Sequence, residues 1–188
     1  RQMCIRDRSE IVQKNIACHQ KLWYYENEKV SIVGTCPAER RYPMNVTVAD
    51  CLRLPTLREA QLVAGAKGLD RAVSSVSVLE WPETNLLSDE LIVGNELVIS
   101  ALVTIKDDVA RQCCVLRHLR SMGAAGLVLF YVGVFIPQID DALIAVADEI
   151  NLPLIAMPFG RMDFRYSDMI TDIVEYIHKR RMQGNYYT

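Results

Sequence analysis

Three short apolar runs, separated by two segments with helical periodicity, constrain the fold of this chain more than any other feature. The runs lie at 96–101, 126–131 and 152–158, and the periodic segments between them lie at 107–123 and 139–151. Strands that alternate with helices in this way are typical of a parallel sheet with crossover helices. The sequence therefore predicts a single α/β domain of the three-layer type with a mostly parallel sheet.

Both crossover segments carry the signals of well-bounded helices. In 107–122 two aspartates begin the helix and Gly123 ends it, as the helix dipole and the left-handed C-terminal position favour. The expected apolar face of this helix is Val109, Cys113, Leu116 and Leu119. The second helix shows the i, i+3, i+4, i+7 spacing of an amphipathic helix, with Asp140 and Asp141 at its start and Asn151 and Pro153 at its end. Its apolar residues are Ile139, Ala142, Leu143, Val146, Ala147 and Ile150.

Shorter elements precede this core. Thr47 is placed to cap a helix at 48–54, which Pro55 would end. Strands are predicted at 61–64 and at 72–79, because the second segment alternates apolar with small polar residues.

A final helix is predicted to begin near Ser167, a residue type suited to the N-cap position. Its apolar stripe is Ile170, Ile173, Val174 and Ile177. Because such a stripe can pack on a second helix, a homodimer through the 166–182 helix is one expectation. A helical turn is also predicted within 82–88.

Charge and composition disfavour several classes of protein. Residues 44–188 hold 13 Lys and Arg against 18 Asp and Glu, and an acidic body disfavours contact with a nucleic-acid backbone. No apolar stretch approaches the ~20 residues of a membrane span, and the charged start lacks the apolar core of a signal peptide. We therefore expect a cytoplasmic protein that contacts neither a membrane nor, directly, nucleic acid.

The six cysteines form no metal-binding pattern. None belongs to a C-x-x-C pair, and no histidine stands at ligand spacing beside them, so no metal site is predicted. Cys113 and Cys114 fall within a predicted helix, where we expect small buried thiols.

The motifs of common active sites are also absent. The chain has no G-x-S-x-G, no P-loop and no G-x-G-x-x-G, so neither a catalytic residue nor a cofactor is predicted. A binding site is expected at the carboxyl ends of the parallel strands, where α/β sheets hold their ligands. The candidate ligand-binding residues at these positions are Glu80, Ser100, Thr104, Tyr131, Gly133, Met157 and Phe159.

Each of these candidates has a less specific interpretation. Ser100 and Thr104 can be ordinary strand-end hydroxyls, and Met157 and Phe159 can be core residues. Two arginines in the loop after the third run can pair with an anionic ligand, although loop arginines are usually only solvated. They are Arg161 and Arg165.

Several blocks of residues resemble one family of bacterial transcription factors. The blocks are TVADCL at 47–52, LVAG at 62–65 with GLDR at 68–71, VSVLEWPE at 76–83, ELVIS at 96–100, GAAGLV at 123–128 and ADEINLPLI at 147–155. In this order and spacing they are similar to the N-terminal domain of the purine catabolism regulator (PucR) family, over residues 44 to about 182. The resemblance implies a sensor domain whose DNA contacts are made by a helix-turn-helix domain far down the chain.

Pattern and resemblance together divide the chain into three parts. Residues 1–43 show no sustained period and begin like a translated sequencing adapter, so we expect a disordered arm or a translation artefact there. Residues 44–163 are the expected PucR-like sensor domain. Residues 164–188 are the expected linker helix, which stops before any DNA-binding domain.

The first interpretation is a sensor that controls catabolic genes in response to a small metabolite, a purine-degradation product or another nitrogen or carbon source. The effector would bind at the strand ends and act on the final helix by favouring one of two states. On this interpretation the chain is not an enzyme, and the missing C-terminal domain binds DNA.

Two alternatives stay open, because a fold does not fix a function. One is a regulatory or substrate-binding domain of an enzyme, and the other is a stand-alone dimerisation module.

Overall fold

The computed structural model describes residues 45–80 and 94–185 of the chain. Within them a five-stranded sheet has the order β1-β5-β4-β3-β2, in which β2 to β5 are parallel and β1 is antiparallel at one edge. The strands are β1 Gln61–Ala64, β2 Ser75–Val78, β3 Glu96–Ser100, β4 Gly126–Leu129 and β5 Leu154–Ala156. The prediction of an α/β domain with a mostly parallel sheet is confirmed.

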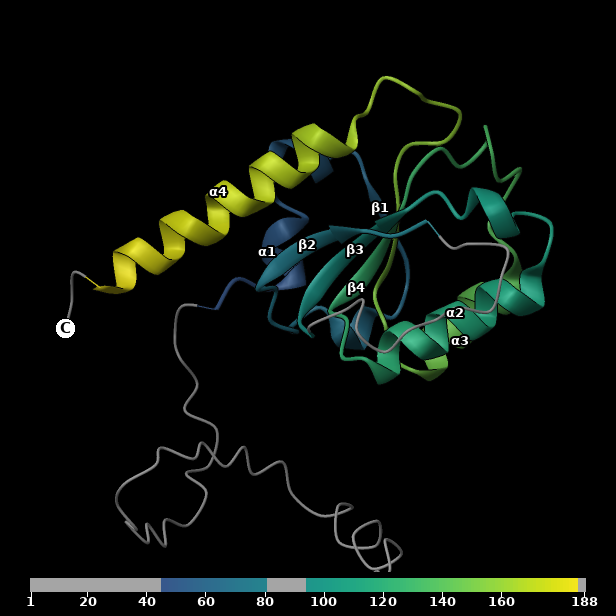
Figure 1. Ribbon diagram of the computed structural model, residues 1–188, viewed down its shortest axis with the longest axis horizontal. Coiled ribbons are helices and arrows are strands. Elements are labelled where there is room, and N and C mark those ends of the chain that lie inside the picture. The colour runs from purple at the N-terminus through teal and green to yellow at the C-terminus, as the bar shows by residue number, and fades with distance from the viewer. Residues whose placement is uncertain (1–44, 81–93, 186–188) are drawn as a thin grey trace, which may run out of the picture. The chain divides into compact units, whose positions relative to one another are not determined.

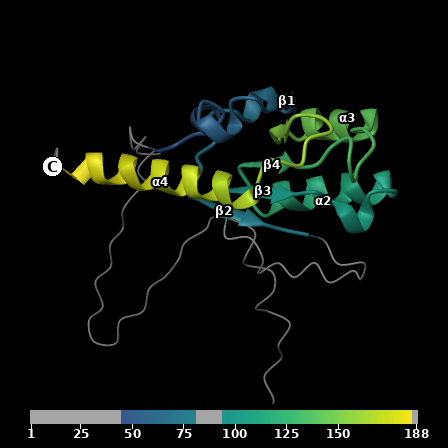
Figure 2. The same ribbon diagram turned by 90° about the horizontal axis from the view of Figure 1, so that it is seen from above.

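Helices cover both faces of this sheet, as Figures 1 and 2 show. Helices α2 Val109–Ser121 and α3 Asp141–Glu149 pack against each other on one face. The other face carries α1 Val48–Cys51 and α4 Tyr166–Asn185. Strands β3, β4 and β5 follow one another in a single direction across the sheet. Since βαβ connections are right-handed, both of their crossover helices fall on the same face.

Strand side chains alternate between two hydrophobic cores. Val98 and Leu127 pack with α2 and α3, whereas Leu97 and Val128 pack with α1 and α4. This alternation is the period-two geometry of a strand. A sheet with apolar residues on both faces has to be covered twice, and the predicted three-layer arrangement follows from it.

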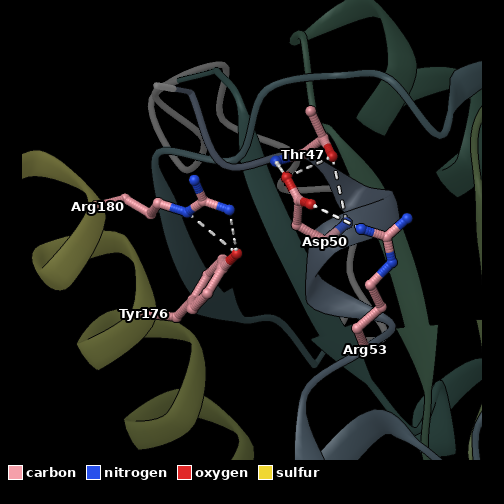
Figure 3. Close-up of polar contacts among 5 residues, drawn as sticks. All are labelled: Thr47, Asp50, Arg53, Tyr176 and Arg180. Atoms are coloured by element: carbon pink, nitrogen blue, oxygen red, sulfur yellow. Dashed lines mark hydrogen bonds and ion pairs between the residues drawn. The ribbon is translucent and has the colours of Figure 1, made fainter. Parts of the chain in front are cut away.

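Short polar side chains begin three of the helices. Thr47 and Asp50 form a capping box at α1, in which each side chain accepts a hydrogen bond from the backbone N–H of the other (Figure 3). Asp108 accepts from the N–H of Arg111 at α2, and Asp140 accepts from the N–H of Ala142 at α3. The expected acidic starts of both crossover helices are confirmed.

The same two helices end as their sequences predict. Gly123 after α2 and Asn151 after α3 adopt left-handed backbone conformations, with φ of 83° and 53°. The next residue in each case donates its N–H to the last turn, from Ala124 to Leu119 and from Leu152 to Ala147. This pairing satisfies carbonyls that a helix end leaves open.

Some details of the sequence prediction are wrong. Helix α1 ends at Cys51, and Pro55 begins a separate 3-10 helix, η2 Pro55–Leu57. Helix α4 begins at Tyr166, so Ser167 lies in its first turn and not at its N-cap. Strand β2 begins three residues later than predicted. The turn expected within 82–88 lies outside the described residues.

The predicted buried face of α2 is confirmed at Leu116 and Leu119 but not at Cys113. Gln112 and Val115 are buried, while Cys113 is half-buried and Cys114 is exposed. The amide of Gln112 donates hydrogen bonds to the carbonyls of Ile105 and Lys106. These bonds satisfy the polar side chain and so allow its burial.

Helix α4 lies antiparallel to the edge strand β2. Its first residue, Tyr166, donates a hydrogen bond to Glu80 just after the strand. Arg181 near its other end donates to the carbonyl of Ser74 just before the strand. Between these points Met169, Ile173 and Ile177 are buried against the sheet. The predicted apolar stripe therefore packs largely on its own domain.

The second half of α4 passes close to α1. Figure 3 shows Arg180 of α4 facing the start of α1, where Asp50 lies. The guanidinium of Arg180 donates to the hydroxyl of Tyr176, at 2.8 and 3.1 Å. The Tyr176 hydroxyl and then the Asp50 carboxylate raise the pKa of Arg180. No helix in the described ranges has the length and apolar character that crossing a membrane requires.

Candidate functional site

The carboxyl ends of the four parallel strands meet at one edge of the sheet. Backbone hydrogen bonds continue just past the strands, from the N–H of Phe130 to the carbonyl of Ser100 and from that of Met157 to Leu129. The loops that leave this edge are 101–108, 130–140 and 157–165. As predicted, residues from separate strands are therefore neighbours here.

A pocket of about 370 Å³ opens beside this edge, on the face of the sheet that carries α4. It lies between the 55–59 segment, which contains η2, and the loop that joins β5 to α4. The first turn of α4 forms part of its wall through Asp168 and Met169. This volume falls at the small end of the range for ligand sites, ~300 to 1,000 Å³, and suits a small metabolite.

The floor of the pocket is apolar. Phe130, Met157 and Met169 line it and are almost completely buried. The half-buried Phe164 lines its side. The Phe130 ring stands perpendicular to that of Tyr166, at 4.5 Å between centroids. Packing of this kind fixes the floor and offers hydrocarbon and ring surface to a ligand.

The rim of the pocket is charged, and Arg161 is its central cation. Arg161 pairs with Glu59 across the mouth at 2.9 Å between Nη1 and Oε2, and it also forms a two-point contact with Asp163. Its guanidinium lies over the ring of Phe164, 4.6 Å from the centroid. The hydrogen bond to Asp163 raises the pKa of Arg161 and lowers the pKa of Asp163. Arg161 therefore ties the β5–α4 loop to the segment after η2.

Two further rim charges differ from Arg161. Within residues 45–80 and 94–185, the Arg165 guanidinium and the Asp168 carboxylate each lack an ion pair. Asp168 accepts a hydrogen bond from the hydroxyl of Ser167. Both charged groups therefore remain open to a bound molecule.

A polar contact joins the opposite wall of the pocket to α4. Thr56 of η2 donates both its N–H and its hydroxyl to one carboxylate oxygen of Asp172, at 3.2 and 2.9 Å. Thr56 lines the pocket and Asp172 lies in the second turn of α4. The wall of the pocket is thus linked to α4 through Thr56 and Asp172 as well as through Asp168 and Met169.

Of the seven predicted site residues, Met157 lines this pocket. Ser100 is fully buried, and its hydroxyl accepts a hydrogen bond from the N–H of Leu102. Thr104 is exposed on a 3-10 helix, Val103–Ile105. Glu80 accepts hydrogen bonds from the N–H of Ala101 and from the Tyr166 hydroxyl. Burial, followed by the Glu80 carboxylate, raises the pKa of Tyr166.

The remaining three predicted residues lie on the loops after β4 and β5 and do not line the pocket. Tyr131 has a left-handed backbone with φ of 58°, and its hydroxyl donates to the carbonyl of Phe164. Phe159 is 71% exposed and lies over Gly133, where a Cβ atom would come within 2.7 Å of its ring. Tyr131 thus holds the backbone of Phe164, a residue of the pocket wall, through this hydrogen bond.

Sequence reasoning missed most of the pocket. Its unpredicted members are Pro55, Thr56, Glu59, Phe130, Asp163, Phe164, Asp168 and Met169. They come from three separate parts of the chain, at 55–59, at 130 and at 163–169, so no local pattern joins them. The usable signal was the pair of loop arginines, Arg161 and Arg165, which both reach the rim. In the described part of the chain, no group of three His, Cys, Asp or Glu side chains could hold a metal ion.

Comparison with known proteins places this α/β domain in a family. Residues 50–177 match the model of the purine catabolism regulatory protein-like family, and this span exceeds half of the chain. The chain belongs to that family, so the resemblance seen in its sequence is confirmed. It is 25% identical over 113 residues to the purine catabolism regulatory protein of Bacillus subtilis (strain 168). The match covers 60% of this chain and 20% of that relative.

Proposed function

We propose that this domain senses a small metabolite in the pocket and passes the signal to α4. The observation that carries the proposal is the position of the pocket. Its wall includes Asp168 and Met169 in the first turn of α4, so an occupant of the pocket touches the helix directly. Family membership supports a regulatory role over an accessory role in an enzyme.

The contacts of α4 supply a route for the signal. The helix is attached to η2 through Asp172 and Thr56, and to the two ends of β2 through Tyr166 and Arg181. A ligand that binds one position of α4 better than another shifts the population toward that position. Movement of the helix would then reach whatever follows it.

The effector proposed here is a purine-degradation product or another nitrogen or carbon source. The name of the Bacillus subtilis relative refers to purine catabolism, and the pocket volume suits a molecule of that size. On this proposal the chain acts in the bacterial cytoplasm as part of a transcription regulator. DNA is bound by another region of that regulator and not by residues 45–185.

A thermal-shift screen of the whole chain tests the proposal. The library holds purine bases, their ring-opened degradation products, amino acids and small organic acids. A ligand at one hundred times its Kd stabilises by about 2.7 kcal/mol, which raises the Tm of a domain of this size by roughly 5 °C or more. A library without any stabilising compound would contradict a sensing role.

Two variants locate the binding site of a stabilising compound. Glu59→Trp places a large ring at the mouth of the pocket and should abolish the shift. Arg117→Gln removes an exposed ion pair with Glu149 between α2 and α3, on the other face of the sheet, and should leave the shift unchanged. A compound that stabilises Glu59→Trp as well as the parent chain binds elsewhere, and such a result would remove the pocket from the proposal.

A further inference from the structure

We propose that two copies of this chain associate through the edge strand β2 and the adjoining side of α4, with the two helices antiparallel. The surface has Val78, Ile170 and Val174 at its centre and Glu80 and Arg181 at its two ends. These five residues form the β2–α4 surface. The sequence suggests only the helix as a contact, whereas the structure adds the strand, the orientation and a charge pairing.

One side of α4 is turned toward β2, along which the helix runs (Figures 1 and 2). Arg181 shows which side this is, because its Nη2 atom donates to the carbonyl of Ser74, just before the strand, at 3.2 Å. Val174 precedes Arg181 by seven residues and Ile170 precedes Val174 by four. This spacing places all three on the same side of a helix. Asp172, which bonds to η2, lies on the opposite flank.

The β2–α4 surface is apolar at its centre and open. Val174 and Val78 are both exposed, and Ile170 is half-buried. Val78 follows by two residues Val76, which packs in the core beneath α4, so both point to the helix-bearing face of the sheet. Adjacent exposed aliphatic side chains on a strand and a helix are typical of a surface that a partner covers.

The strand itself lacks the features that protect an open edge. Among the described strands β2 is the last of the sheet on its side, and its sequence, SVSV, holds neither a charge nor a proline. Natural proteins usually protect such an edge with lysine, with proline or with a covering element. The composition of β2 therefore also favours a covered edge.

The charges at the two ends select a second, antiparallel copy as the partner. Arg181 lies where β2 begins, and Glu80 lies where it ends. In the described ranges neither forms an ion pair, and both hydrogen bonds to Glu80 use the same oxygen, Oε1. A two-fold axis through the middle of β2 places Arg181 of each copy beside Glu80 of the other. A parallel arrangement would set Arg181 against Arg181.

The lengths of the two elements agree with this arrangement. From Tyr166 to Arg181 the helix rises about 22 Å, at ~1.5 Å per residue. From Ser74 to Glu80 the strand extends about 20 Å, at ~3.3 Å per residue. Val174 lies near the middle of this length, so it meets its own counterpart close to the axis. The contact uses the same patch on both copies and closes at two.

The association should be weak, because the patch is small and its ends are polar. We expect a Kd of about 10–100 µM, as is typical of small transient interfaces. At about 1 µM the chain is then monomeric, and unfolding measured at that concentration reports on the single domain.

Sedimentation equilibrium of the whole chain, from about 5 to 500 µM, tests the centre of the interface. Val174→Glu sets two like charges against each other near the axis and should raise the Kd at least about tenfold. Lys179→Gln is the matched control. It removes a charge two residues from Arg181, but on the flank of α4 turned away from β2, where Lys179 pairs with Glu175. It should leave the Kd unchanged.

A double-mutant cycle tests the orientation. Arg181→Gln and Glu80→Gln should each raise the Kd about fivefold, the effect of two exposed ion pairs. Glutamine at position 80 keeps an oxygen that can accept from Ala101 and Tyr166, which now bond to the carboxylate. The double variant should be no weaker than either single variant, because all three lose the same two pairs.

Three results would overturn the proposal. A parent chain that stays monomeric over the whole range has no such interface. A dimer that survives Val174→Glu unchanged forms through another surface. Arg181→Gln that tightens association, or effects of Arg181→Gln and Glu80→Gln that simply add, would show that the two residues do not meet across an antiparallel pair. Circular dichroism confirms that each variant is folded.

Discussion

Replacement of Ile173 by alanine should destabilise the domain strongly, because this residue anchors α4 to the sheet. Ile173 is 0% exposed and lies in the core that α4 shares with α1 and the sheet. The substitution removes three buried carbons, worth about 2.4 kcal/mol at ~0.8 kcal/mol each. The cavity left behind adds to this, so the expected loss of unfolding free energy is about 2–5 kcal/mol.

The next residue in the helix provides the matched control. Val174 is 49% exposed, and alanine is the better helix former, so Val174→Ala should change stability by less than ~0.5 kcal/mol. Urea unfolding followed by circular dichroism measures both variants against the parent chain. Equal and small effects at the two positions would refute the docking of α4 on the sheet, and with it the route proposed for the signal.

Three more predictions follow from particular residues. Gly65→Ala should be far more destabilising than Gly160→Ala in thermal unfolding. Both backbones are left-handed, but a Cβ at Gly65 would meet the Leu152 carbonyl oxygen at 2.0 Å, whereas Gly160 has open space. Iodoacetamide at pH 8 should label the exposed Cys114 and spare Cys51, because burial raises the pKa of the Cys51 thiol to about 12. A homodimer through 166–182, the proposal made from the sequence, would use the exposed Val174, so Val174→Glu should convert a sedimenting dimer to a monomer.

Each of these predictions has a result that contradicts it. Similar losses for the two glycine variants would show that strain, of ~1–2 kcal/mol, decides both sites and that contact does not. Rapid labelling of Cys51 would show that α1 opens easily. A parent chain that sediments as a monomer removes the dimer proposal.

The Cys51 thiol also gives stability a pH dependence of known sign. Its pKa in the folded chain lies above the ordinary value of 9.0, so the unfolded chain loses this proton first as the pH rises. The stability of the folded chain is therefore unaffected by this group below pH 9, and it falls as the pH rises from 9 to about 12. The Cys51→Ala variant should therefore show a shallower fall over this range, and equal slopes would contradict the buried, protonated thiol.

The sequence predicts local features of this fold well because their signals are local. The apolar runs became β3, β4 and β5, and the ends of α2 and α3 follow from Asp108, Gly123, Asp140 and Asn151. Edge pairing is different. Strand β1 lies antiparallel to β5, although about ninety residues separate them, and no periodicity encodes such a pairing.

The pocket was missed for a related physical reason. A crevice forms at strand ends where the strand order reverses and helices leave on opposite faces. Here β3, β4 and β5 run in one direction, and α2 and α3 lie on one face. The pocket forms instead where the β5–α4 loop returns toward η2, and this position depends on long-range packing that involves Arg161 and Glu59.

The residues that carry the family likeness belong to the scaffold. Gly65 and Gly68 allow the backbone to approach Leu152 and Pro153, and Arg71 donates a hydrogen bond to the carbonyl of Ala124. No pocket residue falls within the blocks quoted for the resemblance. The resemblance seen in the sequence therefore rests on the scaffold, while the ligand chemistry has to follow from the pocket.

Hydrogen exchange of the whole chain, with and without a compound selected by the thermal-shift screen, tests the central claim most directly. The account predicts slower exchange of backbone amides in 55–59 and 157–169, and a change that continues along α4 at least to Ile177. Protection confined to other parts of the sheet, with α4 unchanged, would contradict the claim that the pocket is the sensor site and α4 its output.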